Sequence, residues 1–502
     1  MPSRPNYPRT CVSLGFPTPE QMLACAREEA AAGSTFFEFR LDFLPEPESG
    51  LNAIADFLKE CPECRALATC RREANGGRFR GGVESQLDLL TAALEAGATA
   101  VDVELESTRA GMARRLEQIR KQGDLIVSYH HFEATPAMET VFRRLTRIPA
   151  KAYKIAVTAR KPSDILRLLE VARNHRRTPL ILVSMGEIGF PARVVSPIFG
   201  GLFTFAAPSS AAGTAPGQVN ARTLRQLYHV DSLSRTTKIY GVIADPVGHS
   251  ISPAVHNRAF HALRVDAVYV PFLVPPTRLR DFFTLAERLP VRGFSVTIPH
   301  KQKVLRYLDH VDPLSRRIGA VNTVWRKAGK WRGTNTDAPA VTGPLEKRLR
   351  LPGASVLVAG TGGAARAAAF AVADRGARVW ITGRNLDRAR KLAERCGATA
   401  LPVEEAVRGD FDALIHATPL GMHPRTEACF FDGRIPARVV FDMVYNPSET
   451  LLLKRARGQG KTVISGLEMF VDQAVRQFEI WTGCEAPAAV MQRAAREALA
   501  GS

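Results

Sequence analysis

Residues 10–208 alternate between short β-rich runs and helix-like segments, and this alternation constrains the fold more than any other feature of the chain. Helix-like segments such as Thr18–Ala32 and Ser163–Asn174 lie between most of the runs. The eight runs are Thr10–Gly15, Phe36–Asp42, Arg65–Arg71, Ala100–Leu105, Leu125–Phe132, Ala152–Thr158, Leu180–Gly186 and Leu202–Pro208. Eight strand–helix units in succession predict a (β/α)8 TIM barrel.

The length of 502 residues leaves room for further domains after such a barrel. Hydrophobic residues make up 45% of the chain and charged residues 23%, which is typical of a globular protein. No apolar stretch approaches the roughly 18 residues of a membrane span, and the N-terminal segment Met1–Pro5 lacks the apolar core of a signal peptide. We therefore expect a cytoplasmic protein with no membrane partner.

The formal net charge of +19 would suit a nucleic-acid partner, but the arginines are scattered among glutamates and form no basic tail. Small anionic ligands account for this charge equally well, and we expect no nucleic-acid partner. Among the eight cysteines, only Cys61 and Cys64 have the spacing of a metal or redox pair, and nothing completes a zinc site. We expect reduced thiols and no metal. The oligomeric state is not readable from the sequence.

Charged residues stand at the ends of the predicted barrel strands, where TIM barrels hold their reacting groups. Lys154 interrupts the apolar run Ala152–Thr158, His130 lies in the preceding run, and Asp102 and Glu104 lie in the run before that. A buried lysine is costly unless it is paired or loses its proton, and a deprotonated lysine attacks carbonyl carbon. A lysine that snorkels at the edge of the sheet is the structural alternative. The convergence of charged groups favours Schiff-base chemistry at Lys154.

Residues 8–225 resemble type I 3-dehydroquinate dehydratase in four runs, namely Glu38–Asp42, Ser128–Phe132, Tyr153–Ala156 and Ala215–Gln218. The resemblance implies that Lys154 forms an imine with the C3 ketone of 3-dehydroquinate. It implies that His130 removes the C2 proton and then protonates the departing C1 hydroxyl. Arg193, in the loop after the seventh strand, is implied as the clamp for the substrate carboxylate. The other implied substrate-binding residues are Ser13, Glu38, Arg40, Arg71, Thr214 and Gln218.

Two points in this half stay open. Arg40 and Glu38 could instead form a structural ion pair in the barrel wall. The family usually carries a glutamate before a Gly-Gly pair, where this chain has Asn75. The resemblance implies that the glutamate orients and tunes the histidine. Either Glu73 or Glu104 takes over that role here, or the dehydration is slower.

The second half begins after the polar stretch Asp231–Thr237, and we place the boundary near residue 236. The predicted strand Ser355–Ala359 runs into a glycine turn and then into the alanine-rich helix Ala367–Arg375. A strand, a glycine turn and a helix form the dinucleotide fingerprint, although glycine turns also precede helices that bind no nucleotide. The candidate cofactor-binding residues of this turn are Gly360, Gly362, Gly363 and Ala364.

The next predicted strand, Arg378–Thr382, ends where NAD-binding chains place an acidic residue. This chain has Arg384 and Arg388 there instead. Guanidinium groups at this place favour the 2′-phosphate of NADP(H). The structural alternative is that Arg388 and Arg390 form only a solvated helix face, and this alternative fits Arg390 better than it fits Arg384.

Motifs on both sides of the glycine turn resemble shikimate dehydrogenase over residues 238–500. They are Gly248–Pro253, Ser295–Lys301, Gly319–Thr323, Asn335–Asp337, Ala417–Met422, Asp442–Pro447 and Gly466–Met469. The resemblance implies reduction of the C3 ketone of 3-dehydroshikimate with NADPH. Lys301 is implied to stabilise or protonate the developing alkoxide, and Asp337 to hold Lys301 in place. The implied substrate-binding residues are Ser250, Ser252, Thr297, Asn322 and Gln473, and the further cofactor-binding residues are Thr418, Met443 and Gly466.

The sequence therefore predicts an α/β chain in which a barrel of residues 1–236 precedes a shikimate dehydrogenase region of residues 237–502. Within that region, residues 237–340 and 470–502 would bind substrate, and residues 341–469 would form a Rossmann-type NADP-binding part. The first half would produce what the second half consumes, and the whole chain resembles a bifunctional shikimate-pathway enzyme.

Two alternatives to that function remain. The second half could act as a quinate/shikimate dehydrogenase in quinate metabolism, although Ser250, Ser252 and Thr297 fit shikimate better. The chain could also be a non-catalytic quinate sensor, because fold alone does not establish catalysis. A sensor has no need of four reactive residues together, and this chain has all of them: Lys154, His130, Lys301 and Asp337.

Overall fold

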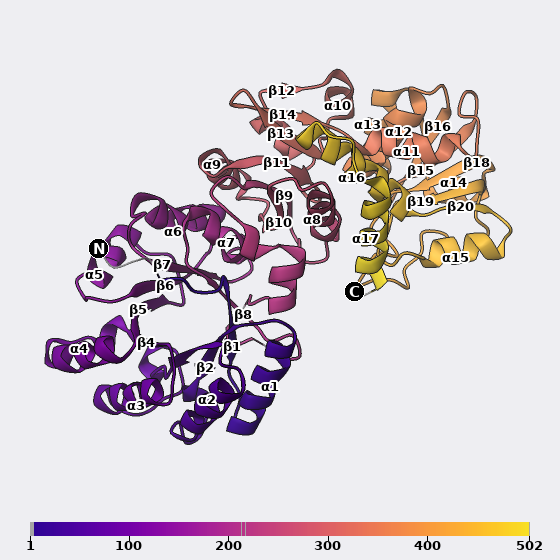
Figure 1. Cartoon of the computed structure of the whole chain (residues 1–502). Coiled ribbons are helices and arrows are strands. Elements are labelled where there is room, and N and C mark those ends of the chain that lie inside the picture. The colour runs from indigo at the N-terminus through magenta and orange to yellow at the C-terminus, as the bar shows by residue number, and fades with distance from the viewer. Residues whose placement is uncertain (1–4, 212, 216, 501–502) are drawn as a thin grey trace. The chain divides into compact units, whose positions relative to one another are not determined.

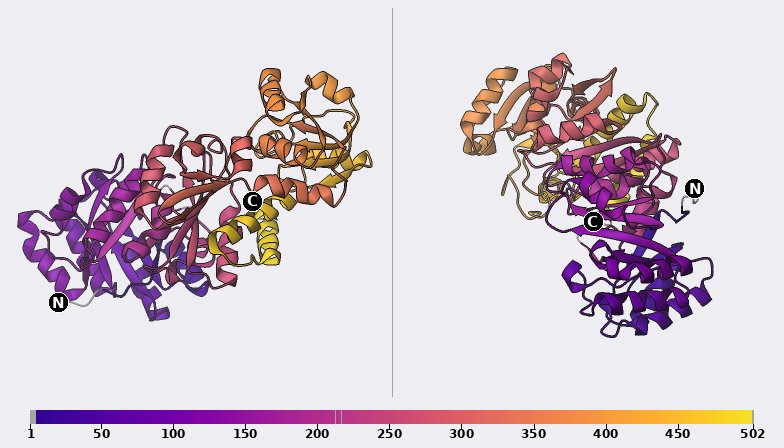
Figure 2. Two further views of the ribbon diagram at one scale, coloured as in Figure 1. Left: turned by 90° about the horizontal axis from the view of Figure 1, so that it is seen from above. Right: turned by 90° about the vertical axis from the view of Figure 1, so that its left-hand side faces the viewer.

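The computed structural model describes residues 5–211, 213–215 and 217–500. Two features of the sequence analysis lie outside these ranges. They are residues 1–4, which make up most of the N-terminal segment that lacks a signal-peptide core, and Pro216 of the Ala215–Gln218 motif. The chain divides into two compact units, one of residues 1–239 and 270–290 and the other of residues 240–269 and 291–502. The described residues form β-sheets of eight, six and six strands. Figures 1 and 2 show the course of the chain through them.

The first sheet is the predicted barrel. Its strand order is β7-β6-β5-β4-β3-β2-β1-β8, and all seven pairings along it are parallel. Six of them join strands that follow each other in the sequence, and the seventh joins β1 to β8. The backbone N–H of Leu202 donates to the carbonyl of Leu180 at 2.8 Å and joins β7 to the segment before β8. The strands are β1 (Thr10–Leu14), β2 (Phe36–Arg40), β3 (Arg65–Thr69), β4 (Ala100–Glu104), β5 (Asp124–His131), β6 (Ala152–Thr158), β7 (Leu180–Met185) and β8 (Thr204–Ala206).

Helices follow the barrel strands and lie outside the ring of strands (Figure 1). The first begins at its capping residue, Thr18, whose hydroxyl accepts from the backbone N–H of Gln21 at 3.3 Å. The helices are α1 (Pro19–Ala31), α2 (Ser49–Glu60), α3 (Val83–Glu95), α4 (Ala113–Gln122), α5 (Met138–Leu145), α6 (Pro162–Asn174) and α7 (Phe190–Val195).

The barrel interior changes from apolar to polar along the strands. The lower layer contains Cys11, Phe36, Leu67, Ala100, Ile126, Ala152 and Ile181, all fully buried. Two residues further along, on the same face, come the polar Ser13, Glu38, Thr69, Asp102, Ser128 and Lys154, together with the apolar Val183. Because the strands are parallel, these polar side chains meet near the C-terminal end of the barrel.

The second sheet has the order β10-β9-β11-β13-β14-β12 and mixes parallel with antiparallel pairs. Its strands are β9 (Lys238–Ala244), β10 (Ala267–Leu273), β11 (Val291–Val296), β12 (His310–Val311), β13 (Thr323–Lys327) and β14 (Lys330–Thr334). The helices of this part of the sequence and of the C-terminus are α8 (Ser252–Ala262), α9 (Leu279–Arg288), α10 (Pro313–Ile318), α11 (Asp337–Glu346), α16 (Gly466–Thr482) and α17 (Ala488–Ala500).

The third sheet is parallel and has the order β17-β16-β15-β18-β19-β20, the arrangement of a Rossmann fold. Its strands are β15 (Ser355–Ala359), β16 (Arg378–Thr382), β17 (Thr399–Ala400), β18 (Phe411–His416), β19 (Ala437–Asp442) and β20 (Thr462–Ile464). The helices of this region are α12 (Gly363–Ala373), α13 (Leu386–Cys396), α14 (Val403–Arg408) and α15 (Leu451–Gly458).

Alternate residues of the Rossmann strands face opposite sides of the sheet. Val356 and Ile415 belong to a core with residues of α11, α12 and α13, while Leu357 and Leu414 belong to a core with residues of α14 and α15. Both faces are therefore covered, as the near-continuous apolar strand sequences require.

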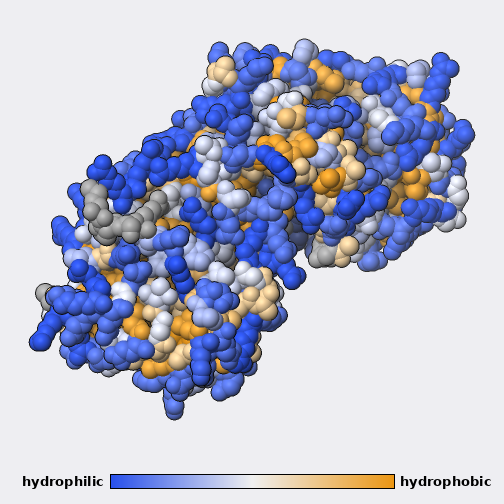
Figure 3. Space-filling model, in the orientation of Figure 1, coloured by the Kyte–Doolittle hydropathy of each residue, from blue (hydrophilic) through white to orange (hydrophobic). Residues whose placement is uncertain are grey.

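The visible surface is mostly hydrophilic, with small hydrophobic patches scattered over it (Figure 3). Within the described part of the chain, no helix has both the length and the apolar character needed to cross a membrane.

Candidate active sites

A cavity opens at the C-terminal ends of the barrel strands, and most of the predicted residues line it. Of the residues predicted for the dehydratase site, all but Ser13 line the cavity. Ser13 donates a hydrogen bond to Glu38, which is one of the lining residues. The predicted residues in the lining are Glu38, Arg40, Arg71, His130, Lys154, Arg193, Thr214 and Gln218. The structure thus brings together predicted side chains from strands β2, β5 and β6, from the segment just after β3, from helix α7 and from the segment after β8.

Lys154 is only 5% exposed and lies on β6 in the polar layer of the barrel. Its Nζ donates to Asp102 Oδ2 at 2.9 Å and lies 3.9 Å from Glu38 Oε1. The ammonium also stands over the ring of Phe205, 4.1 Å from its centroid. Burial beside two carboxylates rules out a lysine that snorkels at a sheet edge, because its charged end points into the cavity.

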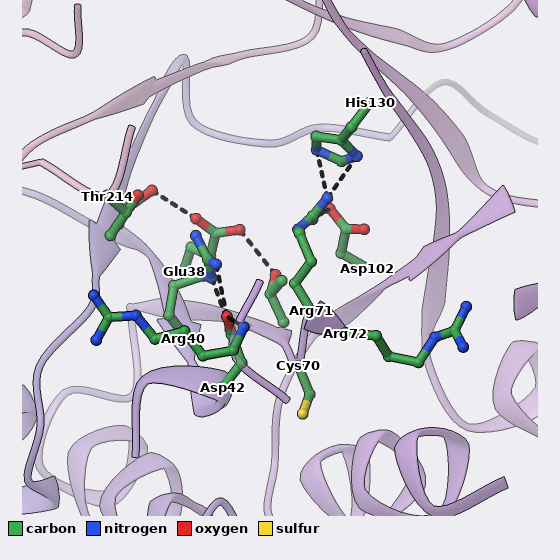
Figure 4. A network of polar contacts seen from close by, with 12 residues as sticks. Glu38, Arg40, Asp42, Cys70, Arg71, Arg72, Asp102, His130 and Thr214 are labelled. Carbon is green, nitrogen blue, oxygen red and sulfur yellow. Dashed lines mark hydrogen bonds and ion pairs between the residues drawn. The ribbon is translucent and has the colours of Figure 1, made fainter. Parts of the chain in front are cut away.

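His130 lies on β5 next to Arg71, and Arg71 in turn reaches Asp102 (Figure 4). An Arg71 nitrogen donates to the imidazole ring, and the other terminal nitrogen donates to Asp102 Oδ2 at 3.2 Å. Burial, together with the charges of Arg71 and Lys154, holds the pKa of His130 well below its ordinary value. The histidine is therefore neutral near pH 7, the state that a general base requires.

Asp102 is the shared counter-charge of this cluster. Burial acts to raise the pKa of Asp102, but the charges of Lys154 and Arg71 outweigh it, and the pKa lies well below its usual range. The hydroxyl of Ser128 donates to the other carboxylate oxygen. Asp102 therefore stays ionised and compensates two buried cations at once.

Glu38 and Arg40 do not pair with each other. Glu38 accepts from the hydroxyls of Ser13 at 2.6 Å and Thr69 at 2.8 Å. Arg40 binds Asp42 through two hydrogen bonds of 2.9 and 2.8 Å. Burial acts to lower the pKa of Arg40, but the pair with Asp42 raises it above the ordinary value. The proposed wall ion pair between Glu38 and Arg40 is therefore wrong in its partner, because Asp42 holds the guanidinium (Figure 4).

Arg193 lies on the short helix α7 and not in a loop, which corrects the prediction from the sequence. Pro191 in the first turn is typical of a helix start. The residue is 1% exposed, and burial lowers the pKa of its guanidinium to about 10. A buried cation at the wall of the cavity suits a substrate carboxylate.

Gln218 organises the loop that follows β8. Its side-chain Oε1 accepts from the backbone N–H of Thr214 at 2.7 Å and from that of Ala215 at 3.2 Å. The hydroxyl of Thr214 also donates to this oxygen at 3.4 Å, and both residues belong to the lining of the cavity.

Asn75 lies at the end of the short 3-10 helix η2 (Glu73–Asn75) and does not take part in the histidine contact. Its side chain accepts from Arg72 at 3.1 Å and donates to Glu106 at 3.2 Å. The two glutamates expected as substitutes do not contact His130 either. Glu73 pairs at 3.7 Å with exposed Arg80, and buried Glu104 accepts from the backbone N–H of Arg72 at 3.0 Å. The residue at the histidine is Arg71.

The sequence interpretation missed two contributors to this site. Asp102 was recognised as a polar strand residue but given no role, and Ser128 was not singled out. Ser128 precedes His130 by two positions and therefore shares its face of β5. The two-residue period from His130, a predicted catalytic residue, was the signal that could have found Ser128.

The second site is built around Lys301, which follows β11. Its Nζ donates to Asp337 Oδ2 at 2.5 Å. The other oxygen of Asp337, the first residue of α11, accepts from Asn322 Nδ2 at 2.7 Å. Asn322 also donates to the Thr336 hydroxyl at 3.0 Å. Asp337 thus bridges the predicted lysine and a predicted substrate-binding amide.

The remaining predicted substrate-binding residues of the second site form hydrogen bonds with other residues of the protein. The hydroxyl of Ser250 accepts from the backbone N–H of Ser252 at 3.3 Å. The N–H of Thr297 donates to the carbonyl of Ile243 at 3.2 Å, and the amide of Gln473 donates to Phe470 on its own helix at 2.9 Å. Their roles toward substrate stay predictions.

The glycine turn between β15 and α12 has the geometry of a nucleotide cradle. Gly360 has φ +131°, and a Cβ on it would lie 2.7 Å from the carbonyl oxygen of Ala417. Gly362 caps α12, in whose first turn Gly363 and Ala364 lie. The turn therefore brings unshielded backbone N–H groups to the start of an eleven-residue helix, which suits a pyrophosphate.

Lys301 packs directly on this turn. A Cβ on Gly363 would lie 3.1 Å from Lys301 Cβ and 3.2 Å from its Cδ. The predicted catalytic lysine and the predicted cofactor turn are thus immediate neighbours.

Exposed arginines follow β16, beside the turn. Arg384 is exposed, and the backbone N–H of Arg388 donates to the capping side chain of Asn385 at 2.9 Å. Arg390 pairs with Asp387 at 3.2 Å and belongs to the solvated face of α13, as predicted. Met443 is partly buried against the core beside α12, and Gly466 begins α16.

The eight cysteines are free thiols in the structure. The donor atoms of Cys61, Glu63 and Cys64 lie within 4.8 Å of one another, but burial raises the pKa of the Cys64 thiol to about 12. A thiol that keeps its proton is a poor metal ligand.

Three segments of the chain match known families. Residues 10–235 match type I 3-dehydroquinase, residues 242–324 match the substrate-binding domain of shikimate dehydrogenase, and residues 466–496 match the C-terminal domain of shikimate 5'-dehydrogenase.

One relative matches both parts of the chain, and others match the shikimate dehydrogenase part alone. The chain is 36% identical to the chloroplastic bifunctional 3-dehydroquinate dehydratase/shikimate dehydrogenase of Arabidopsis thaliana, over 91% of this chain and 79% of that protein. It is 44% identical to an NADP(+) shikimate dehydrogenase of Methanosarcina acetivorans, over 52% of this chain and 99% of that protein. A shikimate dehydrogenase solved in complex with NADP+ superposes with a TM-score of 0.50 at 36% identity, over 53% of this chain and 96% of that one.

Proposed function

The chain belongs to the bifunctional 3-dehydroquinate dehydratase/shikimate dehydrogenases, and we propose that Lys154 and Lys301 are the reactive lysines of its two consecutive reactions. The first converts 3-dehydroquinate to 3-dehydroshikimate, and the second reduces this product to shikimate with NADPH. The observation that carries the proposal is the buried cluster of Lys154, His130, Arg71 and Asp102 in one cavity. A binding module would have no use for two buried cations arranged around one carboxylate.

In the proposed dehydratase step, the residues of the barrel cavity act in the following order. Lys154, once it has given up a proton, adds to the C3 ketone and forms an imine with loss of water. The cationic imine acidifies the C2 hydrogen, and neutral His130 removes it. The resulting imidazolium then protonates the departing C1 hydroxyl, which leaves as water. A second water hydrolyses the imine and frees Lys154 and 3-dehydroshikimate.

The reductase step uses the pair of Lys301 and Asp337. The ammonium of Lys301 stabilises and then protonates the C3 alkoxide that forms when the ketone is reduced. Asp337 holds Lys301 at 2.5 Å and ties it to Asn322. Ser250, Ser252, Thr297 and Gln473 bind the carboxylate and hydroxyl groups of the substrate in this proposal.

The residues around the glycine turn fit NADP(H). Gly360, Gly362, Gly363 and Ala364 would hold the pyrophosphate, and Arg384 and Arg388 the 2′-phosphate. Thr418, Met443 and Gly466 would line the rest of the site. NADPH supplies the hydride when it is bound.

The imine tests the first half of the proposal. We expect 3-dehydroquinate and borohydride to leave a reduced adduct on Lys154, located by peptide mass spectrometry. Lys154→Met should abolish the adduct. Lys151→Met is the matched control, because Lys151 lies just before the same strand and pairs with Asp124 at 3.8 Å. An adduct on another lysine, or none in the unmodified chain, would refute the mechanism.

Substitution of Arg384 tests the proposed preference for NADPH over NADH. Arg384→Ala should raise the KM for NADPH about tenfold or more and narrow the preference over NADH, because one phosphate contact is lost. Arg390→Ala should leave the KM unchanged, because Arg390 pairs with Asp387 on the same helix. An unaltered preference in Arg384→Ala would remove Arg384 from the cofactor site.

We also propose the domain boundary near residue 236, which the family matches ending at residue 235 and beginning at residue 242 support. The proposed subdivision is residues 237–340 with 470–502 for substrate binding and residues 341–469 for NADP(H) binding.

A cytoplasmic location is a proposal as well, and cell fractionation tests it. Turnover of quinate with NADP+ tests the quinate alternative, and we expect shikimate to be the better substrate.

A further inference from the structure

A buried histidine that the proposed mechanism does not use stands beside the cofactor site. His416 is the last residue of β18 and is 1% exposed. Its Nδ1 lies 2.9 Å from Asp442 Oδ1, and its Nε2 lies 2.6 Å from the hydroxyl of Thr418. His416 and Asp442 are paired in register on adjacent parallel strands, which places both side chains on the same face of the sheet.

The contacts of Asp442 decide where the histidine carries its proton. Asp442 is fully buried and also accepts from the backbone N–H of Val444 at 3.0 Å and from the hydroxyl of Thr450 at 2.6 Å. An ionised carboxylate only accepts, and therefore the hydrogen between Asp442 and His416 sits on Nδ1. In the neutral imidazole the other nitrogen, Nε2, is then an acceptor.

This assignment fixes the direction of the Thr418 hydroxyl. The hydroxyl must donate its hydrogen to His416 Nε2, and its oxygen also accepts from the backbone N–H of Leu420 at 3.3 Å. The lone pair that remains can only accept a hydrogen bond from a ligand. The same order of hydroxyl, imidazole and carboxylate orients the serine of hydrolases, although nothing here calls for a nucleophile.

The position of Thr418 selects the part of the cofactor that it meets. In the strand order β17-β16-β15-β18-β19-β20, the glycine turn follows β15, the exposed Arg384 follows β16 on one side, and Thr418 follows β18 on the other. The 2′-phosphate half of the cofactor belongs to the arginine side, and the nicotinamide half therefore belongs to the side of Thr418. A hydroxyl that only accepts would repel a phosphate but would bind a ribose hydroxyl or an amide N–H.

We propose that His416 and Asp442 are positioning residues that hold Thr418 as a hydrogen-bond acceptor for a donor group on the nicotinamide half of NADP(H). The proposal rests on the proposed use of this site for NADP(H) and adds the polarity of the contact. It assigns no chemical step to His416.

Calorimetric binding of two probes tests the proposal, namely NADP+ and adenosine 2′,5′-bisphosphate, which lacks the nicotinamide half. Thr418→Val should weaken NADP+ binding about tenfold, as the loss of one hydrogen bond predicts, and leave the bisphosphate affinity within about twofold. Thr418→Ser should bind both probes like the unmodified chain. Equal weakening of both probes, or no weakening in Thr418→Val, would overturn the proposal.

Variants of the histidine separate positioning from packing. Glutamine can donate to Asp442 and accept from Thr418, and His416→Gln should therefore keep NADP+ affinity within about threefold. His416→Phe keeps an aromatic ring but offers no acceptor, and it should lose as much NADP+ affinity as Thr418→Val. An unchanged affinity of His416→Phe for the bisphosphate would show that the nucleotide-binding fold is intact. Similar losses in His416→Gln and His416→Phe would contradict the relay. If the unmodified chain binds neither NADP+ nor the bisphosphate, the proposed cofactor itself fails.

Discussion

Single residues in the barrel are coupled through Asp102, and this coupling is not visible in the linear sequence. Lys154, Arg71 and Ser128 come from three different segments and all bind the one carboxylate. The sequence indicated Lys154 and His130 correctly as residues of one pocket, because strand ends in a parallel barrel converge. It did not indicate which carboxylate pairs with which cation, because that choice depends on side-chain reach across strands.

Removal of the shared counter-charge should cost more than a typical substitution. We expect Asp102→Asn to lower the free energy of unfolding of the barrel by about 3–5 kcal/mol, because it removes the carboxylate that Arg71 and Lys154 share and leaves Lys154 only the more distant Glu38, at 3.9 Å. Urea unfolding monitored by fluorescence measures this. Asp88→Asn is the control, since its exposed pair with Arg115 should contribute less than about 1 kcal/mol. Equal losses for the two variants would mean that the buried cluster carries no special cost.

The base in the dehydratase site should remain active in mild acid. The pKa of His130 lies below its ordinary value, and the neutral, active form therefore persists as the pH falls below about 6.5. Arg71→Gln removes a positive charge that lowers this pKa, and the acid limb of kcat/KM should move up by about one pH unit. The pH profile of dehydratase turnover measures the shift.

Asn75, the residue that departs from the family pattern, provides the control for this shift of the acid limb of kcat/KM. Asn75→Ala should leave the acid limb where it is, because Asn75 contacts Arg72 and Glu106 and not the histidine. A shift in Asn75→Ala as large as that in Arg71→Gln would show that Asn75 governs the base after all.

At the scale of elements, periodicity predicted the strands well and the short helices poorly. β6 begins and ends at the predicted residues, and most other barrel strands differ by one or two residues because turn residues such as Gly15 and Asp42 follow them. The helix that carries Arg193 spans only Phe190–Val195, too short for a helical period to show. The link between His416 and Asp442 depends on strand pairing, which no local pattern contains.

The start of α12 gives a test at this scale. Gly363→Ala should lower kcat/KM of the reductase about fivefold or more, because its Cβ would lie 3.1 Å from Lys301 Cβ and displace the proposed catalytic lysine. Steady-state kinetics with 3-dehydroshikimate measure the effect. Gly343→Ala is the control: Gly343 lies in α11, where an added Cβ would have no atom within 4 Å outside its own helix and chain neighbours, and alanine there should preserve activity. Unchanged kinetics in Gly363→Ala would show that Lys301 tolerates the contact.

At the scale of the whole molecule, one chain carries two proposed sets of reactive residues, and the product of the first reaction is the substrate of the second. The family assignment covers 91% of the chain, and each half carries its own lysine with its own carboxylate partner. Covalent linkage raises the local concentration of the shared intermediate but does not by itself channel it.

The most direct measurement of the central claim is product analysis with 3-dehydroquinate and NADPH as the only substrates. The unmodified chain should form shikimate. Lys301→Met should stop at 3-dehydroshikimate, and Lys154→Met should leave 3-dehydroquinate unchanged while still reducing added 3-dehydroshikimate. Shikimate formed from 3-dehydroquinate by Lys154→Met, or by Lys301→Met at the rate of the unmodified chain, would contradict the assignment of the two lysines to two consecutive reactions.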